Sequence, residues 1–129
     1  MSGMPGSAPG TRRSRVNGGE KMVTIRYFPQ ENRVTVQGHA GSGEKGRDLV
    51  CSAVSALTYT LAENVNGLGG LAQDVVLRLT PGDAEISCRA EPEYRAVVQL
   101  IFDTIMTGYQ LLGGKYPQYV AVKVFPEPV

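Results

Sequence analysis

The chain has 129 residues, of which 42% are hydrophobic, and it carries a net charge of +1. This length corresponds to one domain with a modest core, and the hydrophobic fraction is typical of globular proteins. Residues 1–21 contain four Lys or Arg and one acidic residue, whereas the remainder has nine basic and eleven acidic side chains. The globular part therefore lacks the positive charge of a nucleic-acid-binding domain, and we expect no direct nucleic-acid partner.

Cysteine, histidine and hydropathy exclude further classes of protein. The chain has two cysteines, Cys51 and Cys88, and one histidine, His39. These are too few for a disulfide framework or a structural zinc site, so we expect neither a metal nor a cofactor. No stretch approaches the roughly 20 apolar residues of a membrane-spanning helix, and no apolar segment follows the N-terminal arginines as in a signal peptide. We therefore expect a cytoplasmic protein without a membrane partner.

The first predicted elements begin after a tail. Residues 1–21 are rich in Gly, Pro, Ser and Arg, which predicts a disordered N-terminal tail or leader before a single domain over residues 22–129. Alternating apolar residues predict one strand over residues 22–28 and a second over 33–38. The short turn between them predicts an antiparallel hairpin. His39 follows the second strand, where its side chain can leave the sheet.

A first helix is predicted over residues 48–65 from apolar residues that recur every three to four positions. This apolar stripe consists of Val50, Val54, Leu57, Leu61 and Val65. Asp48 has the side chain of an N-cap residue, and the glycines from Gly67 onwards end the helix. Cys51 then falls at the third helical position, where free amide hydrogens and the positive end of the helix dipole favour a negative charge.

The second half repeats the pattern of two strands and a helix and adds one strand. Its predicted elements are a strand through Val75, Leu77 and Leu79, a turn at Pro81-Gly82-Asp83, a strand over 84–90, a helix opened by Glu91-Pro92-Glu93 and ended by Gly113-Gly114, and a strand over 119–125. The predicted apolar stripe of the helix is Tyr94, Val97, Val98, Ile101, Ile105, Tyr109 and Leu112. Cys88 is predicted to lie in the core. The order ββαββαβ predicts a single-domain α+β fold, with two helices on one face of a mostly antiparallel sheet.

One imidazole and one thiol are the minimum parts of a cysteine nucleophile with its own general base. His39 and Cys51 are twelve residues apart, and the glycine-rich segment between them lets the chain reverse from the strand end to the helix start. A lone cysteine on a helix is nevertheless more often a small buried hydrophobe, and a lone histidine is more often a surface group. Spacing alone leaves both interpretations open.

The residues around this pair resemble a known family. Gly38-His39-Ala40, then Gly46, then the segment Asp48–Leu57 resemble the ribosomal-processing cysteine protease family (Prp, YsxB-like). The pattern of that family is GHA at a strand end, a short loop, and G-x-D-[IL]-V-C-[AS]-A-V-S-A-L on a helix. The resemblance covers about residues 22–126, and it implies a small α+β homodimer. Members remove a short N-terminal extension, ending in aromatic residues, from a bacterial large-subunit ribosomal protein.

The resemblance also implies roles for single residues. Cys51 matches the nucleophile and His39 the general base. Asp48 matches an acidic residue that orients His39, caps the helix, or does both. Ser55 matches a serine used near the substrate, although a hydroxyl tolerated on the helix face explains it nearly as well. The remaining matches, Gly38 and Gly46, are loop glycines that serve conformation.

We therefore expect a cysteine endopeptidase whose oxyanion is held by the backbone amides near Val50 and Cys51. The alternative is a non-catalytic, ribosome-associated binding module that retains the motif. A redox pair of Cys51 with Cys88 is disfavoured, because Cys88 is predicted to be buried in a strand.

Overall fold

The computed structural model describes residues 22–39 and 45–127. The predicted tail of residues 1–21 and the segment 40–44 lie outside the described residues. The helices and strands are β1 (Val23–Phe28), β2 (Arg33–Gln37), α1 (Lys45–Asn66), β3 (Ala72–Thr80), β4 (Asp83–Ala90), α2 (Arg95–Lys115) and β5 (Val120–Val124). Short 3-10 segments are η3 (Pro29–Glu31), η4 (Gly69–Leu71) and η5 (Pro92–Tyr94). The predicted order ββαββαβ is confirmed.

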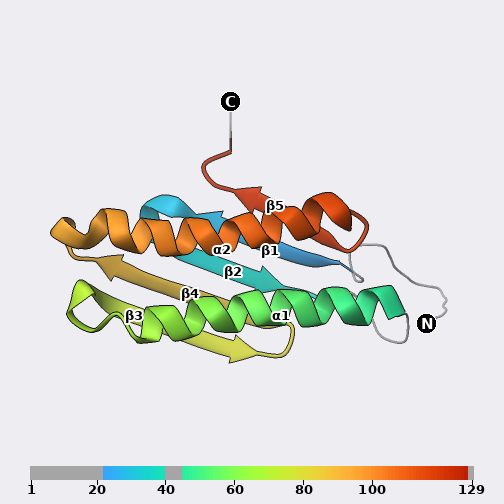
Figure 1. The fold of residues 1–129 in the computed structure, drawn as a ribbon, viewed down its shortest axis with the longest axis horizontal. Helices are drawn as coiled ribbons and strands as arrows, with labels where there is room; N and C mark the ends of the chain where they lie inside the picture. Colours follow the sequence, from blue (N-terminus) through green and yellow to red (C-terminus); the bar gives the residue numbers. More distant parts are fainter. Residues whose placement is uncertain (1–21, 40–44, 128–129) are drawn as a thin grey trace, which may run out of the picture.

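The strands form a single five-stranded sheet in the order β3-β4-β2-β1-β5. Three of its pairings are antiparallel, and the pairing of β1 with β5 is parallel. Both helices lie side by side across one face of the sheet (Figure 1). The predicted α+β fold with a mostly antiparallel sheet is therefore confirmed.

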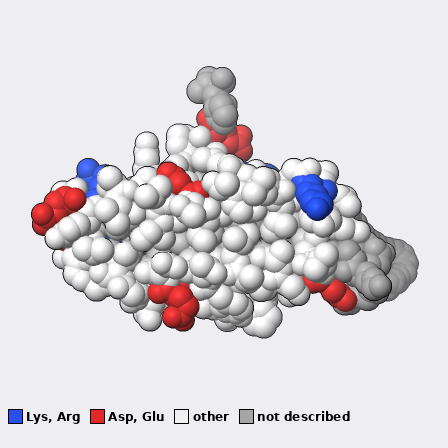
Figure 2. All heavy atoms as spheres, in the orientation of Figure 1, with Lys and Arg blue, Asp and Glu red and all other residues white. Residues whose placement is uncertain are grey.

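Several salt bridges join neighbouring strands of the sheet. Arg33 Nε contacts Glu85 Oε2 at 2.7 Å, and Arg78 contacts both Asp83 at 3.0 Å and Glu85 at 2.9 Å. The Arg78–Asp83 pair is exposed, and a surface pair of this kind contributes about 0–1 kcal/mol. The outer surface of the two helices carries few charged side chains, as Figure 2 shows.

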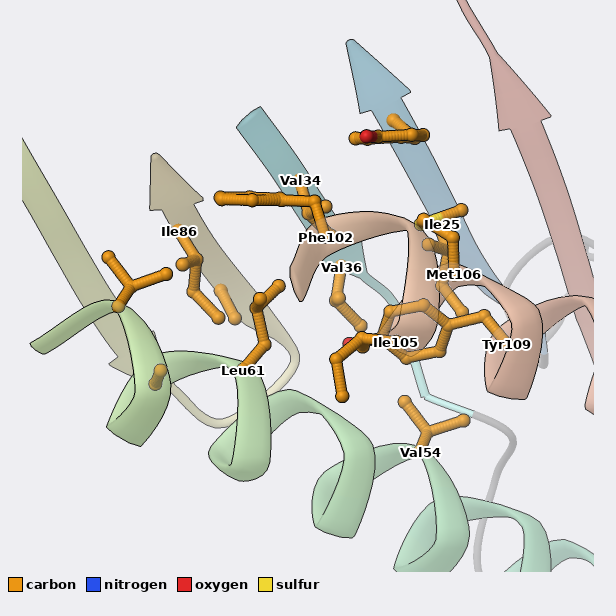
Figure 3. Close-up of a cluster of buried hydrophobic side chains, with 14 of the residues drawn as sticks. Ile25, Val34, Val36, Val54, Leu61, Ile86, Phe102, Ile105, Met106 and Tyr109 are labelled. Carbon is orange, nitrogen blue, oxygen red and sulfur yellow. The ribbon is translucent and has the colours of Figure 1, made fainter. Parts of the chain in front are cut away.

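The core lies between the helices and one face of the sheet. Period-two alternation directs Val23, Ile25 and Tyr27 of β1 toward the helices, and all three are buried. The fully buried Leu61 of α1 and Phe102 of α2 pack over the strands (Figure 3). Burial of a side chain of this size stabilises the fold by about 1.5–3 kcal/mol.

The predicted apolar stripe of α2 is wrong at Val97, which is 50% exposed. The prediction also omitted Phe102 and Met106, which are buried. The buried residues of α2 are Val98, Phe102, Ile105, Met106 and Tyr109. Apolar residues occur on both sides of this helix, so their periodicity alone does not decide which side faces the sheet.

The predicted ends of α2 are also shifted. The helix begins at Arg95, after η5, rather than at Pro92. It continues to Lys115, so Gly113 and Gly114 lie in its last turn instead of ending it. A β-carbon at Gly113 would lie 3.3 Å from Cγ2 of Val122, so the glycine lets β5 pack closely against the helix.

A buried hydrogen-bond chain joins the two helices. The Thr58 hydroxyl donates to the Val54 carbonyl oxygen at 2.7 Å. Because that uses its one proton, Thr58 Oγ1 accepts the proton of the Tyr109 hydroxyl, 2.7 Å away. Burial raises the pKa of Tyr109 from 10.0 to about 12. The fold therefore favours the neutral phenol.

We predict that Tyr109→Phe lowers the free energy of unfolding at pH 7 by about 1 kcal/mol, because one buried hydrogen bond is lost. In the wild type, the unfolded state ionises first above about pH 10, so this part of the stability is lost as the pH rises toward about 12. Between pH 7 and about pH 11, the free energy of unfolding of the wild type should therefore fall by about 1 kcal/mol more than that of Tyr109→Phe.

Urea unfolding followed by circular dichroism at pH 7 and at higher pH measures both effects. Tyr59→Phe is the matched control, because Tyr59 is exposed. A difference between wild type and Tyr109→Phe that stays constant across this pH range would contradict the prediction.

Candidate active site

Helix α1 begins earlier than predicted, and this changes the position of the cysteine. The helix starts at Lys45, so Asp48 lies in its first turn and is not the N-cap. Lysine and arginine are good helix formers, which explains how the helix extends past the predicted cap. Cys51 is therefore the seventh helical residue rather than the third.

The predicted oxyanion donors are wrong for the same reason. In an α-helix only the first four amide hydrogens lack partners, and later ones bond to the carbonyl four residues earlier. The amides of Val50 and Cys51 are therefore used inside the helix. Gly46 was predicted as a loop glycine, but it is the second residue of α1.

One pocket brings the predicted catalytic pair together. Its volume is about 130 Å³, below the roughly 300 Å³ of typical small-molecule sites, which is room for about one side chain. Four segments line it: Val23 at the start of β1, the end of β2 with His39, the α1 stretch from Cys51 to Tyr59, and the β3–β4 hairpin end around Gly82. Its lining residues are Val23, Val36, Gly38, His39, Cys51, Val54, Ser55, Thr58, Tyr59, Leu79, Thr80, Pro81, Gly82, Asp83 and Ala84.

Helical spacing explains which α1 side chains reach the pocket. Residues four apart lie on the same side of a helix, so Ser55 follows Cys51 along the pocket wall. Cys51 is half-buried and Ser55 is exposed. The neighbouring positions Val50 and Leu61 are fully buried in the core. One helix therefore supplies both the pocket wall and part of the core.

His39 is exposed at the end of β2 and lies against the β3–β4 turn. The preceding residue, Gly38, has φ +98°, and its amide donates to the Gly82 carbonyl oxygen at 3.0 Å. A β-carbon at Gly38 would collide with the Met22 carbonyl oxygen, so glycine is required there both by conformation and by space. In the described part of the chain, no hydrogen bond joins His39 to Cys51.

Asp48 is exposed and does not line this pocket. No hydrogen bond to His39 is present within the described residues. In the first turn of α1, its negative charge is favourably placed near the positive end of the helix dipole.

The two cysteines lie in different surroundings. Cys88 is 3% exposed and faces the core from β4, as predicted, and burial raises the pKa of its thiol. Cys51 is half-buried and opens to the pocket. A reactive thiol needs access to solvent or substrate, so of the two only Cys51 is placed to react.

Sequence reasoning missed one wall of the pocket. Pro81-Gly82-Asp83 is recognisable as a turn, but no local signal places it beside His39. Its position follows from the antiparallel pairing of β2 with β4, in which Gln37 lies opposite Asp83. Because β4 starts where β2 ends, the turn before β4 meets the residues after β2.

The described residues contain no group of three or more His, Cys, Asp or Glu side chains arranged to hold a metal ion. None of the described helices combines the length and the apolar character needed to cross a membrane.

Comparisons with known proteins identify the family of the chain. Residues 22–121 match the family described as cysteine protease Prp. No curated protein matches the chain. Among solved structures, SMU.848 of Streptococcus mutans is 27% identical, with 84% of this chain and 97% of that chain covered and a TM-score of 0.62.

Two structures of the essential ribosomal processing protease Prp from S. aureus share the fold. Its complex with a covalently linked product peptide is 24% identical, covers 80% of this chain and 99% of that chain, and has a TM-score of 0.63. Its complex with a substrate peptide is 22% identical, covers 80% and 97%, and has a TM-score of 0.61. Because the family model matches most of its length, the chain belongs to the cysteine protease Prp family and is a cysteine peptidase.

Proposed function

We propose that this peptidase removes the N-terminal extension of a bacterial large-subunit ribosomal protein, with Cys51 as nucleophile and His39 as general base. The observation that carries the proposal is that these two residues, twelve positions apart in the sequence, line the same pocket. The peptide complexes of the S. aureus protease support a peptide as the substrate.

The proposed reaction has two steps. His39 takes the proton of the Cys51 thiol as its sulfur attacks the scissile carbonyl carbon, and the proton then goes to the leaving amine as the C–N bond breaks. Water next attacks the thioester, with His39 again accepting a proton. The C–S bond breaks, which releases the carboxylate product and restores the thiol.

Ser55 is proposed to contact the substrate. Of the serine and threonine hydroxyls that line the described pocket, those of Thr58 and Thr80 already donate to backbone carbonyl oxygens. Ser55 makes no hydrogen bond with a described group, and it lies one turn after Cys51. Its proton is therefore free to bind a carbonyl oxygen of the peptide near the reacting sulfur.

The pocket itself is proposed to take one apolar side chain of the substrate. Much of its wall is aliphatic, including Val36, Val54 and Leu79. Tyr59 and Leu79 are large, exposed and part of the pocket lining, so they offer apolar surface at its opening. This chemistry suits the aromatic end of the extension that family members remove.

Cys51→Ala should lower the cleavage rate of a peptide spanning the extension by about 10⁴-fold or more, because no other group replaces the nucleophile. The fold should be retained, since the change removes one sulfur atom at a half-buried position. Cleavage is measured by mass spectrometry of the products. Ser52→Ala is the matched control, because Ser52 is exposed and does not line the pocket. Full activity in Cys51→Ala would overturn the proposal.

Alkylation separates catalysis from a binding module that retains the motif. Iodoacetamide should modify Cys51 and leave Cys88 unmodified in the folded protein, because burial shields Cys88 and raises the pKa of its thiol. His39→Ala should slow the modification of Cys51 by about tenfold or more, since the base is lost. Peptide mapping measures both rates. Equal, slow labelling of the two cysteines, or no effect of His39→Ala, would favour the binding module.

We also propose that the protein acts as a homodimer, as the family resemblance implies, and in the cytoplasm. Val97, Leu100 and Leu111 are exposed on α2 at spacings of three and eleven residues, which places them on one side of the helix. Leu100 and Leu111 are 66% and 71% exposed. The surrounding surface carries few charges (Figure 2), so it suits a second copy of the same face.

Leu100→Glu should convert the dimer to a monomer, because each copy would place a charge in the apolar contact. Light scattering coupled to size-exclusion chromatography measures the mass. Gln110→Glu adds the same charge to an exposed position away from this stripe, and it should leave the dimer intact. Dissociation by both variants, or by neither, would argue against this surface as the interface.

A further inference from the structure

We propose that Gly82, in the β3–β4 turn, is a positioning residue that seats the imidazole of His39 beside Cys51. The inference rests on the proposed role of His39 as general base. It extends the site to a residue outside the sequence motif.

The contact between Gly82 and His39 is direct. A β-carbon at Gly82 would lie 2.7 Å from Cε1 and 3.0 Å from Cδ2 of the imidazole, and closer still to Nε2. Such distances are shorter than atoms in van der Waals contact tolerate. The edge of the ring that carries Nε2 therefore packs on the Cα of Gly82, and any side chain at position 82 would occupy the space of the ring.

The turn requires glycine for a second reason. Gly82 has φ +74° and follows Pro81, and proline followed by a residue with positive φ is the pattern of a type II turn. Gly69 shares the requirement for positive φ but not the lack of space for a β-carbon. It also has positive φ, +58°, but a β-carbon there would have no atom within 4 Å. Comparison of the two positions isolates the contact with His39 from backbone strain.

Two hydrogen bonds fix the β3–β4 turn relative to His39. The Gly38 amide donates to the Gly82 carbonyl oxygen at 3.0 Å, which ties the residue before His39 to the turn. Across the turn, the Thr80 hydroxyl donates to the Asp83 carbonyl oxygen at 2.6 Å. The backbone of His39 and the surface under its ring are thus fixed to the same hairpin.

No other described interaction orients the ring. Within residues 22–39 and 45–127, His39 forms no hydrogen bond and no ion pair. Among the described residues, contact with Gly82 is therefore the interaction that orients the ring. A shift of about 1 Å in a catalytic group can lower a rate by about 100-fold, so loss of the seat should be visible in catalysis.

The first test observes His39 itself. Because the chain has one histidine, the imidazole Cε1–H gives one assignable NMR signal. Gly82→Ala should shift that signal, and Gly69→Ala should leave it in place. Where alanine at position 82 prevents folding, Asn replaces it at both positions, because Asn tolerates positive φ better than other side chains. If the chemical shift of this signal is unchanged in a folded Gly82 variant, the proposal that Gly82 orients the imidazole is wrong.

The second test measures cleavage of the same extension peptide. Gly82→Ala should lower kcat by about tenfold to 100-fold with KM changed less than about twofold, and Gly69→Ala should retain wild-type kcat. A shifted signal with unchanged kcat overturns the positioning role. If the wild type cleaves no such peptide, the proposed function fails, while the NMR comparison still decides whether Gly82 seats the ring.

Discussion

The fold and its site depend on the pairing of β2 with β4 at the centre of the sheet. Each half of the chain forms a hairpin and a helix from local signals, and this antiparallel pairing joins the two hairpins into one sheet. Its register sets Val36 opposite Ala84 and Gln37 opposite Asp83. A shift of one residue would turn the buried side chains of β4 away from the helices. The same register brings the turn before β4 against the residues that follow β2.

Local patterns predicted the elements well, and long-range contacts account for what they missed. The alternation of apolar residues predicted the ends of β1 and β4 to within one or two residues. The motif around Cys51 also included His39 and Ser55, which line the same pocket as Cys51. The start of α1 at Lys45 was missed because Asp48 looks like a cap. The inward side of α2 was misplaced because apolar residues such as Val97 and Leu100 also lie outside. The wall around Gly82 has no local signal, since strand order alone brings it to His39.

The position of Cys51 changes how its reactivity is explained. A cysteine at a helix start would gain from free amide hydrogens and the dipole, but Cys51 lies in the second turn, where those amides are already bonded. Under the proposed function, activation of the Cys51 thiol therefore depends on His39 as the base. The free hydroxyl of Ser55 then becomes more important, because the helix backbone has no donors to offer there.

The pocket walls come from four segments spread between residues 23 and 84, and this has a consequence for when the site forms. The hydrogen bond from Gly38 to Gly82 joins residues that are far apart in the sequence. Bringing them together lowers the conformational entropy of the chain, and the contacts of the completed sheet compensate for this loss. A nascent or partly unfolded chain can expose the Cys51 thiol but lacks the opposite wall. Under the proposed function, peptidase activity therefore arises only together with the native fold.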